Sequence, residues 1–437
     1  MKPSKKLFIK SFGCQMNDHD AEQMAGLLEN EGYALTDRPD DADLIIMNTC
    51  SIRDKAEQKA YSEFGKLDAL KKNRPGLVIG FAGCVARQEG AAVLKRISNV
   101  DFVMGPRNIS SLPGIIDRVA NRERVVEIHD EAVVAPSRPS RRKDNLKAWV
   151  TIMEGCNYGC TYCVVPTTRG GERSRPSREI FHEVEELAAE GFAEITLLGQ
   201  TVNSYGRNLP ERIDFADLLR ILQQIEPIRR IRFMTSHPSD MTEKLAETIA
   251  AHPKLCKHVH LPIQSGSDRI LGLMKRGYDT ASYLEKVRML RSRIPQISIT
   301  SDIIAGFPGE TESDFNATLE ILKIAEFDAI FAFKYSDRPN TLAPSFEGAL
   351  SEDTKSARLG EILELQKSLS IEKNGRLIGS IQEVLVEGYS KNSRERWFGR
   401  TDCNRMVHFN ALRELKGQSV PVRIVGARAS SLEGDLV

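Results

Sequence analysis

Three closely spaced cysteines near the middle of the chain could hold a metal centre that does chemistry. Cys156, Cys160 and Cys163 follow an apolar run at residues 149–153 and have the spacing C-x3-C-x2-C. Four-iron clusters of the iron–sulfur type normally take four cysteine ligands, so a loop that supplies three leaves one iron open to another molecule. The alternatives are a zinc knuckle completed by a histidine, or buried cysteines without a ligand role. Because zinc sites favour C-x2-C pairs, the pattern predicts an iron–sulfur cluster.

A second set of cysteines, Cys14, Cys50 and Cys84, is spread along the N-terminal part of the chain but shares one local context. Strand-like and helical segments alternate here, which indicates a parallel sheet. Ligand sites of such sheets lie beyond the carboxyl ends of the strands, and helix N-termini nearby favour thiolates and an anionic cluster. We therefore expect the three thiols to converge, although three buried cysteines with no ligand role stay an alternative. The apolar runs that precede them lie at residues 7–9, 44–47 and 77–81.

The composition is that of an ordinary globular protein, and the length suggests roughly three domains of about 150 residues. The 437 residues are 41% hydrophobic, and 61 basic against 60 acidic residues give a net charge of +1, so a nucleic-acid surface would have to be local. Neither a signal peptide nor an apolar stretch of the roughly 18 residues that span a bilayer is found. We expect a cytoplasmic protein without a membrane partner, in which the thiols serve metal binding or catalysis.

Six strand-and-helix units between residues 149 and 335 predict an incomplete (βα)6 barrel, so the fold class expected is α/β. One helix is expected where Ile180, Val184 and Leu187 recur at i, i+4 and i+7. In βα barrels the chemistry lies at the carboxyl ends of the strands, and the three-cysteine loop follows the first of them. The strands are expected at residues 150–153, 193–198, 231–235, 258–261, 299–304 and 329–333.

Polar residues follow the later barrel strands and could line a pocket at the barrel's mouth. Each of them alone is more simply an ordinary hydrogen-bonded loop residue, but as a ring around one mouth they favour a ligand site. Glycines in the last of these segments let the backbone approach a ligand closely. The residues are Gln200, Asn203, Thr235, Ser236, His237, His260, Gln264 and those at 302–310.

Two basic segments are candidates for contact with RNA. The periodicity breaks at residues 127–147, which contain Arg141 and Arg142 and are either a solvated linker or a segment lying against phosphates. A polar helix at 351–374 leads to a tail whose short strands predict a five-stranded small barrel. In this tail Lys391, Arg396 and Arg400 stand among aromatic residues. That mixture suits phosphate neutralisation and base stacking, but also an ordinary solvated hairpin.

The three-cysteine loop, with Tyr162 before its last cysteine, resembles the radical S-adenosylmethionine (SAM) enzymes. The tail resembles the TRAM domain, a small RNA-binding barrel, through GRT at 399–401 followed by Asn404 and Val407. Over nearly its whole length the chain resembles the methylthiotransferase family of radical SAM enzymes. Val85, Arg87 and Thr201 depart from the residues usual in its closest branch, which acts on N(6)-isopentenyladenosine beside the anticodon of tRNA. Similarity to that branch is carried by GCQMN at 13–17, NTCSIR at 48–53 and LGQTVNSY at 198–205.

The resemblance implies a methylthiotransferase domain at 1–126, a basic linker at 127–147, a radical SAM domain at 148–374 and a TRAM domain at 375–437. It implies two [4Fe-4S] clusters, one held by each cysteine triad, and two SAM molecules per turnover. The methylthio group would be placed on carbon-2 of the adenine, with no catalytic side chain beyond the cluster ligands. SAM contacts would come from Tyr162, Gln200, Ser236, His260, Gln264, Asp302 and Gly306, and RNA contacts from Arg141, Arg142, Lys391, Arg396 and Arg400.

The partners implied are tRNA, an electron donor such as flavodoxin or ferredoxin, and an iron–sulfur delivery protein. Cys256 and Cys403 belong to neither triad and are expected to be packing residues. Alternative substrates are an aspartate of a ribosomal protein and threonylcarbamoyl adenosine in tRNA. An alternative of another class is a non-catalytic iron–sulfur regulator that binds RNA, which would form no 5′-deoxyadenosine when it meets SAM in the reduced state.

Overall fold

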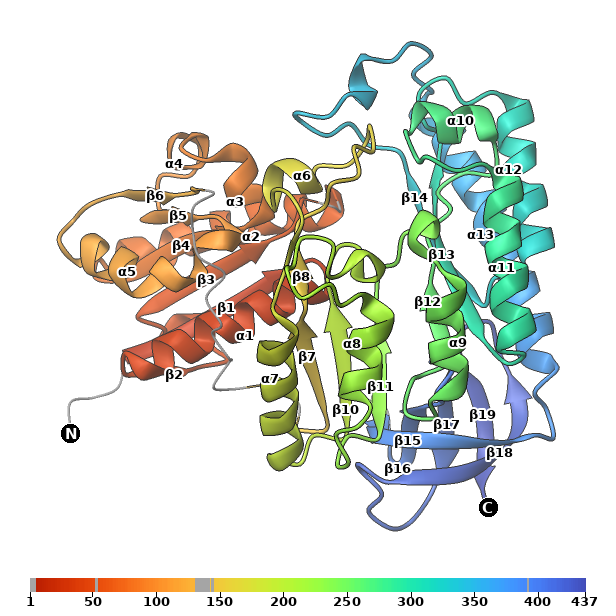
Figure 1. The fold of residues 1–437 in the computed structure, drawn as a ribbon. Helices are drawn as coiled ribbons and strands as arrows, with labels where there is room; N and C mark the ends of the chain where they lie inside the picture. Colours follow the sequence, from red (N-terminus) through yellow and green to blue (C-terminus); the bar gives the residue numbers. More distant parts are fainter. Residues whose placement is uncertain (1–4, 52–53, 130–141, 143–144, 391–392) are drawn as a thin grey trace.

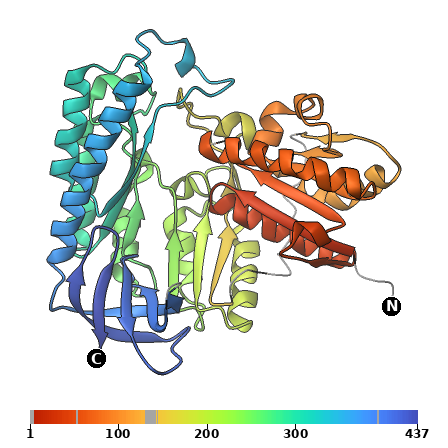
Figure 2. The same cartoon turned by 180° about the vertical axis from the view of Figure 1, so that it is seen from behind.

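The computed structural model describes residues 5–51, 54–129, 142, 145–390 and 393–437, and divides into three parts (Figure 1). An N-terminal α/β part lies beside a central part with parallel strands, and a small barrel lies at the end of the central part where those strands begin (Figures 1 and 2). This arrangement confirms the expected α/β class with a C-terminal β-barrel. No helix among the residues described is both long and apolar enough to cross a bilayer.

The N-terminal part is a six-stranded parallel sheet in the order β2-β1-β3-β4-β5-β6. All six residues of its central strand β3 are buried because helices cover both faces, as is usual for parallel sheets. One face packs against α1 and α5, and the other against α2, α3 and α4. The strands are β1 (Lys5–Phe12), β2 (Tyr33–Leu35), β3 (Leu44–Thr49), β4 (Val78–Gly83), β5 (Phe102–Met104) and β6 (Val125–Glu127); the helices are α1 (Gln15–Asn30), α2 (Asp54–Asn73), α3 (Cys84–Glu89), α4 (Ala92–Arg96) and α5 (Leu112–Ala120), with 3-10 turns η1 (Pro39–Asp41) and η2 (Pro106–Ser111).

The central part confirms the incomplete six-stranded barrel. Its strands form two parallel sheets, β11-β10-β7 and β12-β13-β14. Hydrogen bonds join the two sheets where Ile231 N donates to the Lys254 carbonyl at 2.8 Å and Ser236 N donates to the His260 carbonyl at 3.1 Å. The described strands thus make an arc with β7 at one edge and β14 at the other. The strands are β7 (Lys147–Thr151), β10 (Glu194–Leu198), β11 (Arg230–Phe233), β12 (His258–His260), β13 (Ser298–Ala305) and β14 (Ala329–Lys334).

Helices cover the outside of the arc, and the largest hydrophobic core lies between them and the strands. Ile180, Val184 and Leu187 are fully buried on one face of α7, as their spacing predicted. The helices are α6 (Val165–Thr168), α7 (Ser177–Ala189), α8 (Phe215–Leu222), α9 (Glu243–Ala251), α10 (Asp268–Leu273), α11 (Thr280–Arg293), α12 (Glu312–Ala325) and α13 (Glu352–Gly375); β8 (Met153–Glu154) and β9 (Arg173–Ser174) form a short hairpin, and η3 (Val202–Ser204), η4 (Pro238–Asp240) and η5 (Ala343–Ser345) are 3-10 turns.

The tail is a closed five-stranded barrel in the order β15-β16-β17-β19-β18, as expected. Trp397 fills its core, and its indole N–H donates to the Ala411 carbonyl at 3.1 Å. The barrel packs against the start of β11, where Arg230 donates to the Arg400 carbonyl at 2.6 Å and Arg232 to the Thr401 carbonyl at 2.7 Å. The strands are β15 (Ile381–Ser390), β16 (Ser393–Arg400), β17 (Met406–Asn410), β18 (Ser419–Ala427) and β19 (Leu432–Leu436).

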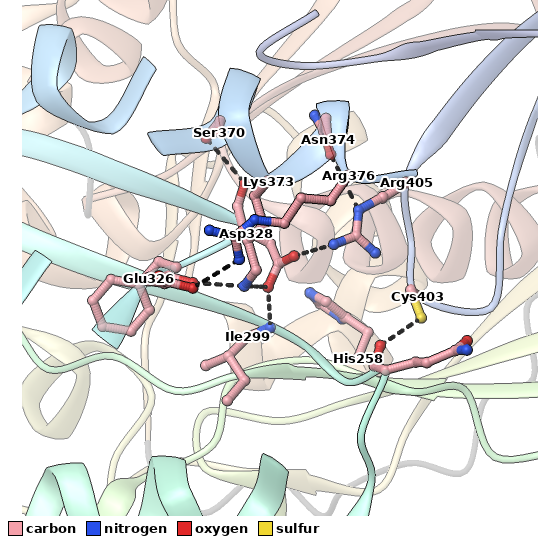
Figure 3. A network of polar contacts seen from close by, with 12 residues as sticks. His258, Ile299, Glu326, Asp328, Ser370, Lys373, Asn374, Arg376, Cys403 and Arg405 are labelled. Carbon is pink, nitrogen blue, oxygen red and sulfur yellow. Dashed lines mark hydrogen bonds and ion pairs between the residues drawn. The ribbon is translucent and has the colours of Figure 1, made fainter. Parts of the chain in front are cut away.

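A buried polar network around Asp328 also joins the tail to the central part (Figure 3). Asp328, just before β14, accepts a hydrogen bond from Ile299 N at 2.8 Å and pairs with Lys373 of α13 at 2.8 Å. Arg405 of the tail contacts the same carboxylate and donates to Asn374 at 3.2 Å. Because burying a charge is favourable only when it is paired, this network fixes the tail relative to the strand starts.

Candidate active site

The three N-terminal thiols lie at the carboxyl ends of three neighbouring strands. Cys14 precedes α1 after β1, Cys50 follows β3, and Cys84 is the first residue of α3 after β4. Since β1, β3 and β4 are adjacent in the sheet, the cysteines are brought to one edge although they are far apart in sequence. The thiols of Cys14 and Cys50 are within hydrogen-bond reach of each other.

Two buried asparagines tie the first two cysteine loops together. Asn48 donates to the Asn17 carbonyl at 2.6 Å, and Asn17 donates in turn to Asn48 Oδ1 at 3.4 Å. The Cys14 thiol lies 3.2 Å from Asn17 Oδ1. A side chain at Gly13 could not be accommodated, because its Cβ would lie 2.4 Å from Cys50 Cβ. The glycine and the two asparagines beside these cysteines are therefore explained by the close packing and the hydrogen bonds of the two loops.

The surroundings of the N-terminal triad favour the thiolate form of one cysteine, Cys14. The hydrogen bond from Cys50 lowers the pKa of Cys14 to about 6, and the guanidinium of Arg169 acts in the same direction. Burial raises the pKa of Cys84, an effect that Arg169 partly offsets. Arg169 comes from the central part, is buried, and pairs with Asp20 of α1 at 2.6 Å. A buried cation next to these thiols suits an anionic group bound at the triad.

The second triad lies on the loop between β8 and α6, beyond the carboxyl end of β7. Burial raises the pKa of Cys156, and it raises that of Cys163 to about 12. The sulfur of Cys160 accepts a hydrogen bond from the buried guanidinium of Arg276 at 3.3 Å. Arg276 is held in place by the hydroxyl of Tyr278 at 2.8 Å. Each triad therefore has one buried arginine beside it.

One cavity connects the two triads. Cys14 and Cys84 line it from the N-terminal part, and all three cysteines of the central loop line it from the other side. Cys50 is fully buried next to Cys14. Thiols of both parts thus open onto a common chamber.

The donor sets fit iron–sulfur clusters. In the described part of the chain, no three His, Cys, Asp or Glu side chains are grouped closely enough to hold a single metal ion. A four-iron cube is bound differently, since each thiolate binds a separate iron and the sulfurs are therefore spread apart. Three thiols at each site would leave one iron of a bound cluster for an exogenous ligand. The hydroxyls of Ser51 and Ser236 line the cavity and are buried without a hydrogen-bond partner among the described residues, which suits a polar ligand.

Three family models match the chain: the uncharacterized protein family UPF0004 at residues 6–105, the radical SAM superfamily at 150–322 and the TRAM domain at 375–437. The tRNA-2-methylthio-N(6)-dimethylallyladenosine synthase of Desulforamulus reducens is 46% identical, covering 100% of this chain and 96% of its own length. The chain belongs to the family of this synthase. The synthase of Carboxydothermus hydrogenoformans is 45% identical over 99% of both chains. The protein is therefore a radical SAM methylthiotransferase.

Solved structures support the fold of this methylthiotransferase. The radical SAM methyltransferase TsrM from Kitasatospora setae matches with a TM-score of 0.57 at 14% identity, covering 87% of this chain and 78% of its own. The cobalamin-dependent radical SAM enzyme OxsB matches with a TM-score of 0.52 at 10% identity, covering 85% of this chain and 56% of its own. At such low identity the similarity concerns the fold alone.

Five of the seven residues predicted to contact SAM line the chamber of the methylthiotransferase. Gln200 accepts a hydrogen bond from Gly155 N at 2.5 Å, so its side chain supports the cysteine loop. Asp302 lies 3.4 Å from a ring nitrogen of His260. The contacts with SAM themselves stay a prediction. The five chamber residues are Tyr162, Gln200, Ser236, Gln264 and Asp302.

The other two predicted residues, His260 and Gly306, do not belong to the chamber lining. His260 is buried in the interior of the arc, where its Nδ1 lies 3.0 Å from the Thr300 hydroxyl. Gly306 N donates to Glu310 at 2.9 Å, and the space where a side chain would stand is taken by Lys355. In this structure His260 and Gly306 therefore contact neighbouring protein groups and not the chamber.

The residues predicted to contact RNA are placed in different ways. Arg142 donates to the Trp149 carbonyl at 2.7 Å and pairs with Glu183 at 3.1 Å, so its guanidinium is buried within the protein. Arg396 pairs with Glu433 at 3.1 Å and Arg400 donates to the Asn404 carbonyl at 3.1 Å, both on the tail. Arg141 and Lys391 lie outside the described residues, as does most of the basic linker. RNA contact by these residues stays a prediction.

Sequence reasoning did not single out Arg169, Arg276 or Tyr158 as site residues. The Tyr158 ring stacks on His237 with centroids 3.6 Å apart, and both line the chamber. Burial lowers the pKa of His237 to about 3, so its imidazole is neutral. The glycines after Arg169, at 170–171, were an available signal of close packing.

Proposed function

We propose that this methylthiotransferase adds a methylthio group to carbon-2 of N(6)-isopentenyladenosine next to the anticodon in tRNA. The observation that carries the proposal is one chamber lined by cysteines of both triads, two from the N-terminal part and three from the central loop. A sulfur source and a hydrogen-abstracting group have to meet at the same carbon atom, and a common chamber provides that meeting. The names of the relatives at 45–46% identity point to the same substrate.

In this proposal Cys156, Cys160 and Cys163 would hold the cluster that cleaves SAM, and Cys14, Cys50 and Cys84 would hold an auxiliary four-iron cluster. When bound, the two clusters supply the electron for SAM cleavage and a place for the sulfur that receives the methyl group, so two SAM molecules are used per turnover. The protein's own contribution is positional and electrostatic. Arg169 and Arg276 offset the negative charge of thiolates and bound groups in a buried setting.

Other groups in the chamber would orient the ligands. Ser236 offers its hydroxyl to a polar ligand. His237 is neutral, and one of its ring nitrogens has no hydrogen-bond partner within the described chain. The target base would have to leave its stack to reach this enclosed site, as for other enzymes that act on a base. The tail barrel would anchor the adjacent RNA through its basic and aromatic residues.

We further propose that the enzyme works in the cytoplasm, where flavodoxin or ferredoxin would reduce the clusters and an iron–sulfur delivery protein would load them. This partner set follows from the cofactors: a reduced cluster needs an electron donor, and a buried cluster needs delivery during assembly.

The proposal is tested with two triple variants, Cys14→Ala/Cys50→Ala/Cys84→Ala and Cys156→Ala/Cys160→Ala/Cys163→Ala, reconstituted without oxygen. Each should lose about half of the iron and sulfide of the wild type. The first should still cleave SAM but transfer no methylthio group to prenylated tRNA, whereas the second should do neither. Cys256→Ala is the matched control, because this buried thiol belongs to neither triad.

Two outcomes would contradict the proposal. One is unchanged iron content in either triple variant. The other is wild-type enzyme that adds the methylthio mass to a ribosomal protein or to threonylcarbamoyl adenosine and not to prenylated tRNA.

A further inference from the structure

The register of β14 with β13 shows that two phenylalanines of β14, Phe331 and Phe333, face the interior of the arc. Asp302 of β13 pairs with Phe331 of β14, and Ile304 pairs with Phe333. Paired residues of neighbouring parallel strands point to the same face, and Asp302, Ile304 and Phe333 line the chamber. The alternate residues of the strand, Ile330 and Ala332, pack instead against the helix-side core.

These rings are unusually accessible for interior aromatic side chains. Phe331 is 47% exposed and Phe333 is 38% exposed. Their strand is an edge of the arc, since among the described strands β14 pairs only with β13. The Phe331 ring meets the His260 ring edge-on, with centroids 5.7 Å apart. The result is an apolar strip that starts in the chamber and runs about 7 Å toward the amino end of the strand, the rise of two strand residues.

We propose that Phe331 and Phe333 bind the isopentenyl chain of the target adenine and so select prenylated tRNA. This inference rests on the proposed function and adds the residues that recognise the substrate. In adenine, carbon-2 and the N6 substituent lie on different sides of the six-membered ring, with N1 between them. The outward bonds at these two positions diverge, so a base whose carbon-2 faces the thiol triads can place its N6 chain along the strip.

The surroundings match this occupant. The five-carbon chain is apolar, and burying it against two phenyl rings removes apolar surface of both partners from water. Next to Phe333 the chamber lining continues through Lys334, which pairs with Glu352 at 2.8 Å, and through Arg338. Positive charge at this position suits the phosphates that flank a flipped nucleotide. An apolar strip ending in cations is complementary to a prenylated nucleotide within RNA.

The test measures binding and turnover with two anticodon stem-loops that differ only in the isopentenyl group. Wild-type enzyme should prefer the prenylated RNA, and Phe331→Ala/Phe333→Ala should reduce this preference by about tenfold or more, in both the ratio of Kd values and the ratio of kcat/KM values. Phe331→Leu/Phe333→Leu should retain most of the preference, because it keeps an apolar surface. Ile324→Ala is the control, since this 56% exposed side chain lies on α12, outside the arc.

The outcomes separate this inference from the proposed function. If the wild type methylthiolates neither RNA, the proposed function fails. If it methylthiolates prenylated RNA and the Ala variant keeps the full preference, the inference alone fails. An equal loss of affinity for both RNAs would also overturn it, because the rings would then contact the base or the backbone rather than the chain. Matching thermal midpoints of the Ala and Leu variants establish that both are folded.

Discussion

At the scale of single residues, the site combines thiols that the sequence reveals with arginines that it does not. The cysteines could be identified because their spacing, or their position after apolar runs, carries the chemistry by itself. Arg276 acts on Cys160 from 116 positions away, and Arg169 meets Asp20 across 149 positions. Nothing in the local sequence distinguishes such a buried guanidinium from a solvated one, because its partners are brought to it only by the fold.

Arg276 should set how readily the cluster on the central loop is reduced. Hydrogen bonds to cluster sulfurs raise the reduction potential. Replacing Arg276 with Met removes the bond to Cys160, and we expect a midpoint about 60 mV more negative, corresponding to a charge-assisted hydrogen bond of about 1.5 kcal/mol. A redox titration followed by electron paramagnetic resonance measures it. Lys275→Met, the loss of an exposed neighbouring charge, is the control, and equal shifts in both variants would rule out the specific role.

At the scale of elements, the strands and helices that matter for the site were predictable from periodicity. The predicted six strands of the central part agree with those observed to within a few residues. Short elements such as β2 and β8 were not anticipated, because two or three residues carry too little pattern and form strands only through their neighbours. The contact of α1 with the segment after α6 was also beyond prediction, since it depends on how the first two parts meet.

The pair formed by Asp20 and Arg169 across that contact should be costly to break. Both side chains are almost fully buried, so Arg169→Met leaves an unpaired carboxylate inside the protein. We expect the free energy of unfolding of the cluster-free protein to fall by about 3–5 kcal/mol, as measured by urea denaturation. The double variant Asp20→Leu/Arg169→Met should recover much of that loss. Arg118→Met, in an exposed pair with Glu123, should cost less than about 1 kcal/mol.

If Arg169→Met proved no more destabilising than Arg118→Met, the contact between the two parts would have to rest on other groups. The same would follow if the double variant were less stable than the single one.

At the scale of the whole molecule, the three parts and their order were predictable, but the position of the tail was not. Its closed barrel packs beneath the strand starts, at the end of the arc opposite the thiols (Figures 1 and 2). The polar groups that hold it, among them Arg230, Arg232 and Asp328, appear in the sequence only as ordinary charged residues.

Asp328 should control the attachment of the tail (Figure 3). Asp328→Asn keeps the shape of the side chain but leaves Lys373 and Arg405 without their anionic partner. We expect a loss of about 3 kcal/mol in the free energy of docking the tail, seen as faster amide hydrogen exchange at its interface with the strand starts. Glu352→Ala, which removes an exposed partner of Lys334, should leave exchange there unchanged. Equal protection in Asp328→Asn and wild type would show that the arginines of β11 suffice.

The tail's position beneath the arc affects how products leave the chamber and how RNA and SAM enter it. Because the tail covers that end, we expect spent methionine and nucleoside fragments to leave by the opening through which the RNA enters. We therefore expect a docked RNA to slow the replacement of one SAM molecule by the next. In the proposed mechanism, the sulfur-methylating half of the cycle would then run best before RNA arrives, and an RNA-free, pre-charged enzyme would be the form that meets its substrate.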